Sequence, residues 1–144
     1  MVTCTFEDGG TTSLRHVVVE TLIIENNNIL LVKRAAHLIN PGLWAIPGGY
    51  VDRDETCKDA AIREAREETG YQIAIESLLE IEDRPDRPKE DRQNIVFAYR
   101  AKPMQKVDTH DSESTEMKWF SLDSLPPENE FAFDHYQRIQ KFFL

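Results

Sequence analysis

The chain has 144 residues, of which 40% are apolar and 30% charged, and its formal net charge is −9. This length and composition predict a single globular domain over residues 1–144 that folds without disulfides or a structural metal. The acidic excess argues against nucleic acid and anionic membranes as partners, because such partners usually meet basic faces. A small anionic substrate is still compatible, provided that bound cations reverse the field at its site.

The scarce cysteines and histidines argue against a zinc site. Cys4 and Cys57 have neither CxxC spacing nor neighbouring histidines, which favours a reducing cytoplasm. No apolar run approaches the length of a membrane span, and the first residues carry no signal-peptide pattern. We therefore expect a cytoplasmic protein, with residues 1–12 disordered or forming an arm. None of the histidines has the spacing of metal ligands: His16, His37, His110 and His135.

Apolar periodicity and turn residues predict a mixed α+β chain without repeats. Three consecutive asparagines, residues 26–28, predict the turn of a hairpin. The triplet Pro47-Gly48-Gly49 predicts a break after a short extended piece. In chain order we expect strands over residues 15–25, 29–33, 44–46, 71–81, 94–101 and 118–121, and helices over residues 56–69 and 133–144.

The helix over residues 56–69 is the most informative element. Thr56 has the side chain of an N-cap, and Gly70 has the conformational freedom that a helix stop requires. At about 100° per residue, three glutamates share one face of this helix, namely Glu64, Glu67 and Glu68. The neighbouring stripe is apolar and is predicted to lie on a sheet: Ala61, Ile62 and Ala65.

Three clustered carboxylates have two interpretations. They repel one another unless hard divalent cations bind them, and Mg²⁺ and Mn²⁺ prefer such oxygen ligands. Alternatively, they form a solvated acidic face with i,i+4 pairs such as Arg63 and Glu67. Residue types and the helical wheel leave these two interpretations open.

The spacing of the whole segment resembles the signature of the Nudix hydrolases. It runs from Gly49 through Glu55, the Arg63-Glu64-Ala65 triplet and the Glu67-Glu68 pair to Gly70. The sequences LWAIPGG, EMKWFSLDSLP and AFDH also resemble that family. The resemblance implies an α/β/α sandwich with a mixed β-sheet, in which the central helix binds Mg²⁺ or Mn²⁺ and the enzyme hydrolyses a nucleoside diphosphate linked to X.

The same resemblance implies roles for individual residues. Arg63 would orient a glutamate, and Glu55 would support the central helix. The implied metal ligands are Gly48, Glu64, Glu67 and Glu68, where the glycine lets the backbone approach the ion.

The general base is left open between the helix and a later loop. Glu68 and Glu64 are the helical candidates, while Glu113 and Glu116 lie downstream. Among the downstream pair we prefer Glu113, because a loop residue can reach over the metals.

Pro85, about fifteen positions after Gly70, resembles the pattern of ADP-ribose and nucleotide-sugar pyrophosphatases. The product would be a nucleoside monophosphate and a sugar phosphate. Alternatives are a nucleoside triphosphate pyrophosphatase and a non-catalytic nucleotide sensor. The candidate substrate-binding residues are Arg34, Arg84, Arg87 and Trp44. Related proteins often pair, so we also expect a homodimer.

Overall fold

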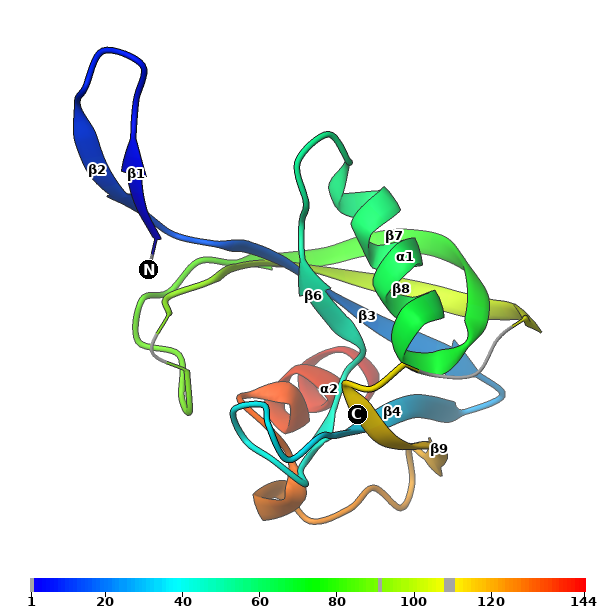
Figure 1. Cartoon of the computed structure of the whole chain (residues 1–144). Coiled ribbons are helices and arrows are strands. Elements are labelled where there is room, and N and C mark those ends of the chain that lie inside the picture. Colours follow the sequence, from blue (N-terminus) through cyan, green and yellow to red (C-terminus); the bar gives the residue numbers. More distant parts are fainter. Residues whose placement is uncertain (1, 91, 108–110) are drawn as a thin grey trace.

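The computed structural model describes residues 2–90, 92–107 and 111–144 (Figure 1). Its elements, in chain order, are β1 (Val2–Thr5), β2 (Thr11–Leu14), β3 (Val17–Glu25), β4 (Asn28–Arg34), β5 (Trp44–Ala45), β6 (Gly48–Tyr50), α1 (Cys57–Thr69), β7 (Tyr71–Glu82), β8 (Ile95–Lys106), β9 (Ser114–Ser121), the 3₁₀ helix η1 (Glu128–Glu130) and α2 (His135–Phe143). None of the helices in the described part of the chain combines the length and the apolar character that crossing a membrane requires.

A seven-stranded mixed sheet forms the centre of the described chain. Its path is β5-β4-β3-β8-β7, with β6 paired to β3 and β9 paired to β4. The pairing of β3 with β8 is parallel, whereas the other pairs in this sheet are antiparallel. Sheet and helices together give the α+β fold and the sandwich that the sequence predicted.

The two helices cover opposite faces of the sheet, because side chains alternate along a strand. Val19 packs in a cluster with Ala60 and Ala61 of α1. Leu22, three positions further along β3, packs in a cluster with Ile139 of α2. The central strand β3 is therefore buried on both sides, which explains its long apolar run.

The β3–β4 hairpin confirms the interpretation of the asparagine run. Asn26 and Asn27 both have positive φ, 49° and 62°. Two such residues make the turn that matches the twist of antiparallel strands, and asparagine tolerates this conformation better than most residues. Glu25 and Asn28 close the hairpin as a pair.

The break predicted at Pro47-Gly48-Gly49 is wrong in part, because the glycines start β6. Gly48 pairs with Glu20 of β3, and the two backbones lie very close together. A Cβ at Gly48 would lie 2.0 Å from the carbonyl oxygen of Val19. Glycine here permits a close strand approach rather than a turn.

Helix α1 has the predicted ends. The Thr56 side chain accepts from the backbone N–H of Asp59 in a capping box, and Gly70 ends the helix with φ 73°. The predicted apolar stripe needs one correction: Ile62 is 39% exposed, and Ala60 is buried in its place. Small alanines let α1 approach the sheet closely, while the larger isoleucine lies at the edge of the contact.

Several elements differ in length from the sequence prediction; β3, for example, begins at Val17 and not at residue 15. Strand β8 extends to Lys106, and β9 begins at Ser114, because pairing with β7 and β4 continues past the apolar segments. Helix α2 begins at His135, so the predicted start was two residues early. Asp134 precedes it without capping it, since its carboxylate accepts from Arg87.

A buried ionic network joins α2 to the sheet. Glu20 of β3 lies 3.2 Å from Arg87 and also forms an ion pair with Arg138. Arg87 reaches Asp134 at 2.6 Å, and Arg138 reaches Glu80 at 2.9 Å. Each buried charge in this network has an opposite partner, as burial requires.

The N-terminal segment, predicted to be disordered or an arm, contains the hairpin β1–β2. Its register pairs Val2 with Leu14. Figure 1 shows this hairpin extending away from the main sheet. Phe6, at its tip, is 47% exposed.

Replacing Glu20 with glutamine should destabilise the fold strongly. Burial alone would raise the pKa of Glu20, but the charge of Arg138 and the neighbouring His135 hold it well below its usual value. The neutral amide leaves Arg87 and Arg138 short of a counter-charge, so we expect a loss of about 3–5 kcal/mol in the free energy of unfolding. Urea denaturation at neutral pH measures this loss.

The stabilisation by Glu20 is present above the ordinary carboxyl pKa and is lost as pH falls through its lower folded-state value. The difference between wild type and Glu20→Gln should therefore shrink in acid. Glu25→Gln, at the exposed end of the same strand, is the matched control and should unfold like wild type. Equal stability of Glu20→Gln and this control would contradict the role of the network.

Candidate active site

The glutamates of α1 gather beside β6. Glu68 is 3% exposed, and its Oε2 accepts from the backbone N–H of Gly48 at 2.8 Å. Glu64 is largely buried, whereas the Glu67 side chain is 49% exposed. The three carboxylates thus follow a gradient from the interior to solvent along one helix face.

Arg63 holds this cluster together. It donates to Glu64 at 2.7 Å and to Glu67 at 3.1 Å. Two further bonds reach Glu55, at 2.7 and 3.1 Å, and another reaches the carbonyl oxygen of Tyr50 at 2.9 Å. Hydrogen bonding to Glu55 raises the pKa of Arg63 and lowers that of Glu55, so each group stabilises the charged form of the other.

The environment of Glu64 and Glu68 disfavours their negative charge. Burial is the main cause that raises the pKa of Glu64; Arg63 opposes it, while the charges of Glu67 and Glu113 add to it. Burial also raises the pKa of Glu68 well above its usual value, against the hydrogen bond from Gly48. A bound cation would relieve both effects, because opposite charge favours the ionised form.

Gly49 provides the space for the Glu64 carboxylate. A Cβ at this position would lie 2.5 to 2.6 Å from the three atoms of the Glu64 carboxyl group. The side chain of Glu64 therefore lies directly over the β6 backbone. The two glycines have different roles: Gly48 admits the neighbouring strand, and Gly49 admits the carboxylate.

The chemistry of the donor atoms suits a hard divalent cation. Carboxylate oxygens from one helix and from Glu113 are the ligands that Mg²⁺ and Mn²⁺ prefer. Within the described residues, no three acidic, histidine or cysteine side chains already converge in a metal-holding geometry. Arg63 draws Glu64 and Glu67 to itself, and Gly48 engages Glu68, so binding an ion requires these carboxylates to turn from their present partners.

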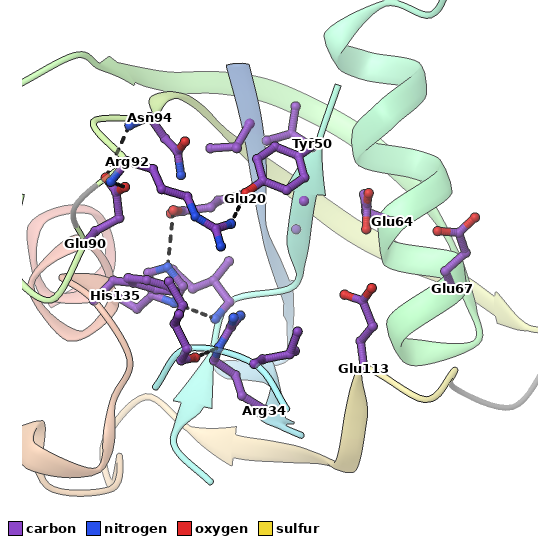
Figure 2. A pocket seen from close by; sticks show the side chains of 18 of the residues that line it. Glu20, Arg34, Tyr50, Glu64, Glu67, Glu90, Arg92, Asn94, Glu113 and His135 are labelled. Atoms are coloured by element: carbon purple, nitrogen blue, oxygen red, sulfur yellow. Dashed lines mark hydrogen bonds and ion pairs between the residues drawn. The ribbon is translucent and has the colours of Figure 1, made fainter. Parts of the chain in front are cut away.

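One pocket of about 340 Å³ joins this acidic cluster to the far side of β6. Figure 2 shows Glu64, Glu67 and Glu113 on one side of it and Arg92 and Asn94 on the other. Its lining comprises Val18, Val19, Glu20, Arg34, Leu38, Ile39, Ile46, Gly48, Gly49, Tyr50, Arg63, Glu64, Glu67, Arg87, Glu90, Arg92, Asn94, Asp111, Glu113, Phe133 and His135.

Among the predicted substrate-binding residues, Arg34 is the one best placed in the pocket. Its Nε donates to the carbonyl oxygen of Ile39 at 2.7 Å, and its guanidinium lies 5.1 Å from the centroid of the Phe133 ring. Burial lowers the pKa of Arg34, while the charges of Glu68 and Glu113 oppose that shift. Arg34 therefore brings a fixed positive charge close to the acidic cluster.

The other predicted substrate residues lie elsewhere. Trp44 is buried in the core, with Phe120 at a ring distance of 4.8 Å, and lies outside the pocket lining. Arg84 pairs with Glu82 at 2.9 Å and lies beside a different hollow. Arg87 does line the pocket, but its guanidinium is bound within the buried network.

Of the two downstream glutamates, one lines the pocket and the other does not. Glu113 lines the pocket and points toward Glu64 and Glu67 (Figure 2). Glu116 lies 3.6 Å from Lys33 and does not line this pocket. His110 falls outside the described residues.

Several lining residues escaped sequence reasoning. Glu20 and His135 sit in apolar surroundings that suggested only strand and helix positions. Asn94 was expected only as the first residue of a strand, which in the structure begins at Ile95, and Glu90 lies in a polar loop. The AFDH sequence was the available signal for His135, but no pattern in the chain marked the other three as pocket residues.

A family model described as the NUDIX domain matches residues 14–142. The chain thus belongs to the Nudix family and is a Nudix hydrolase, a class of enzyme that generally uses divalent metals.

Among its relatives, the ADP-ribose pyrophosphatase of Methanocaldococcus jannaschii is 35% identical over 127 residues, which cover 88% of this chain and 72% of that protein. The CTP pyrophosphohydrolase of Escherichia coli is 40% identical over 58 residues, 40% of this chain and 43% of that protein. A crystal structure of a bifunctional NMN adenylyltransferase/ADP ribose pyrophosphatase from Francisella tularensis, complexed with AMP and Mn ion, aligns with TM-score 0.75 and 30% identity, covering 90% of this chain and 41% of that chain.

The two neighbouring glycines should respond differently to alanine. Gly48→Ala drives a Cβ into the backbone of Val19, which cannot move without breaking the sheet, so unfolding free energy should fall by at least about 2 kcal/mol. Gly49→Ala meets only the flexible end of Glu64. That variant should keep most of its stability and lose about 100-fold in turnover, because Glu64 is displaced.

Urea denaturation and steady-state hydrolysis, run on both variants, separate the two effects. Gly10→Ala, in the N-terminal hairpin, is the control and should match wild type in turnover. Full activity of Gly49→Ala would show that the position of Glu64 does not matter for the reaction.

Proposed function

We propose that this enzyme hydrolyses, with Mg²⁺ or Mn²⁺, the pyrophosphate bond of a nucleoside diphosphate linked to X. The substrate class is ADP-ribose or a nucleotide sugar, and the products are a nucleoside monophosphate and a sugar phosphate. One observation carries the proposal: Glu64 and Glu67 of α1, Glu113 and the cation Arg34 line a single pocket. Such a pocket presents metal ligands and a phosphate partner on the same cavity wall.

Glu64, Glu67, Glu68 and the backbone of Gly48 would hold the cation. When bound, the metal polarises the phosphoryl group and lowers the pKa of bound water. Arg63 acts through the glutamates, since its bonds to Glu64 and Glu67 set their positions before the ion arrives. Charge-assisted bonds of this kind are short and directional.

Glu113 is the preferred general base, with Glu68 and Glu64 as the alternatives. Its carboxylate points toward Glu64 and Glu67 from the same side of the pocket, whereas Glu68 is buried against Gly48 (Figure 2). In the step, the water oxygen bonds to phosphorus and gives its proton to the Glu113 carboxylate. The bond from phosphorus to the bridging oxygen breaks, and the second phosphate leaves with that oxygen.

Arg34 is assigned to the diphosphate. Its Nε is held by Ile39, and no described residue accepts from its Nη groups, which suits them to phosphate oxygens. A nucleoside triphosphate would engage the same cation, and the E. coli relative is named for CTP hydrolysis, so triphosphate hydrolysis is the second candidate. The intact glutamates argue against a non-catalytic sensor.

We further propose that the whole chain acts as one domain, as a homodimer in the cytoplasm. Both cysteines, Cys4 and Cys57, are free thiols, which suits a reducing compartment. The exposed hairpin β1–β2 supplies a surface on which a second copy can pack.

A substrate panel with product identification tests the function directly. ADP-ribose, nucleotide sugars and nucleoside triphosphates are incubated with Mg²⁺ or Mn²⁺, and the products are separated by chromatography. We expect a nucleoside monophosphate and a sugar phosphate from the first two groups. Release of inorganic pyrophosphate from triphosphates, with no turnover of nucleotide sugars, would select the second candidate.

Glu67→Gln should nearly abolish turnover and leave the fold in place, because the half-exposed carboxylate is proposed to bind metal rather than support packing. We expect a fall of at least about 100-fold in kcat, together with weaker Mn²⁺ binding by isothermal titration calorimetry. Glu130→Gln, an exposed acid far along the chain, is the control. Unchanged Mn²⁺ affinity in Glu67→Gln would refute the ligand assignment.

Glu113→Gln separates the base from the ligands. If Glu113 accepts the proton of water, kcat should fall by about 10²–10⁴-fold, while KM and Mn²⁺ affinity stay close to wild type. Steady-state kinetics and metal titration on the same preparation provide both readouts. A kcat within a few-fold of wild type would move the role to Glu68 or Glu64.

A further inference from the structure

The end of the pocket remote from α1 has its own polar lining, which the reaction at the acidic cluster does not use. We call it the distal end and define it by Tyr50, Glu90, Arg92 and Asn94. Figure 2 shows these side chains across the pocket from Glu67. The distal end is therefore open to whatever part of the substrate extends away from the diphosphate.

The main observation at the distal end is a polar atom of Asn94 that is unpaired within the described chain. Its Oδ1 is buried and has no hydrogen-bonding partner among the described residues. A buried polar atom without a partner costs folding free energy, so most such atoms in native proteins are satisfied. Because Asn94 lines the pocket, a ligand there can supply the missing donor once the side chain turns its oxygen toward the cavity.

The backbone around Asn94 is fixed before a ligand binds. The Glu90 carboxylate accepts from the backbone N–H of Asn94 at 3.2 Å and also from the backbone N–H of Arg92. One side chain thus clamps the two lining residues of this loop. The backbone position of Asn94 is therefore set by the protein, while its side-chain amide stays free to pair with a ligand.

Tyr50 adds an aromatic surface next to this amide. Its hydroxyl accepts from the guanidinium of Arg92, and its ring lies 5.0 Å from that of His16. The Tyr50 side chain is 38% exposed, so part of the ring stays accessible in the pocket. A pre-positioned ring beside an unpaired amide suits a flat ligand with polar edges, such as a nucleobase.

We propose that Asn94 is a specificity-determining residue that recognises a nucleobase carrying an exocyclic amino group, with Tyr50 as the stacking surface. This proposal rests on the proposed function, which places the diphosphate at the other end of the pocket. Adenine and cytosine both present an amino donor beside a ring-nitrogen acceptor, and an amide side chain matches that pair. Hypoxanthine and uracil present a carbonyl oxygen instead, which leaves the Asn94 oxygen unpaired in the orientation that the structure gives this amide.

Strand β6 supports the two ends of this arrangement. Gly48 and Gly49 lie beneath the carboxylates of α1, and Tyr50, the next residue, reaches the distal end. One short strand, paired with β3, thus contributes a residue to each end, while Glu90, Arg92 and Asn94 come from the loop before β8. Rigid elements position site residues more accurately than loops do. The base and the diphosphate are therefore held in a fixed position relative to each other.

Binding of four nucleoside monophosphates tests the proposal without turnover. Isothermal titration calorimetry compares AMP with IMP and CMP with UMP, on wild type and on Asn94→Leu, which keeps the side-chain size and removes its polar atoms. We expect wild type to prefer the amino base of at least one pair by about 10- to 100-fold. The preference should fall to within about two-fold in Asn94→Leu, and the pair that shows it identifies adenine or cytosine.

Two further variants act as controls. Asn129→Leu, an exposed asparagine in η1 outside the pocket lining, should keep the wild-type preference. Tyr50→Leu should weaken binding of the preferred pair and leave the ratio within it unchanged. Thermal unfolding of each variant shows that the comparison concerns folded protein.

The outcomes separate this proposal from the proposed function. A preference that survives in Asn94→Leu, tighter binding of IMP or UMP than of their amino partners, or no binding of any of the four, would overturn the role of Asn94. A preference that disappears in Asn94→Leu, in an enzyme that does not cleave nucleotide sugars, would keep Asn94 and reject the substrate class. Cleavage of nucleotide sugars by an enzyme without base preference would keep the substrate class and reject the role of Asn94.

Discussion

The convergence of four acceptors on Arg63 is the interaction on which the site depends. Without that guanidinium, Glu55, Glu64 and Glu67 would repel one another at the end of a helix that packs closely on the sheet. Its bond to the carbonyl oxygen of Tyr50 also ties the helix to β6. A single cation therefore both neutralises the acidic cluster and fixes the distance between the two elements that form the pocket.

The opposite wall is stabilised by a second set of charges, those around Glu20. This network joins β3, the loop that carries Arg87, and the first turn of α2. His135 takes part through its Nδ1, which accepts from the backbone N–H of Ile46 at 3.0 Å. Its Nε2 lies 3.2 Å from Glu20, on the other side of the ring. Two separate ionic clusters thus enclose a pocket in a protein whose overall charge is negative.

The sequence predicted those parts of the fold that rest on local rules. The capping of α1 by Thr56 and Gly70 and the asparagine turn are examples, since both depend on neighbouring residues alone. It missed β6, because the close approach to Val19 is visible only once the strands are paired. For the same reason the polar start of β9 showed no strand pattern, although pairing with β4 extends the strand to Ser114.

The site, like the fold, was predictable where it depends on neighbouring residues and not where it depends on the pairing of distant segments. The spacing of the acidic residues indicated the cluster on α1, and the resemblance to the Nudix signature implied a role for Arg63 beside it. Residues such as Asn94 and Glu20 come from other segments. They line the same pocket only because β3 pairs in parallel with β8. Trp44 and Arg84 were expected to meet substrate for their chemistry, but their side chains pack in the core and pair at the surface respectively.

The parallel pairing also bears on how the molecule folds. Residues at the start of β3 lie beside the start of β8, and the whole of α1 and β7 intervenes along the chain. Contacts between such distant segments form late, since the entropy of closing the loop must be overcome before they contribute. Helix α1 and its caps can form early, but the pocket exists only after β8 has docked. Catalytic competence is therefore a late product of folding, and it reports on the complete sheet rather than on the helix that carries the glutamates.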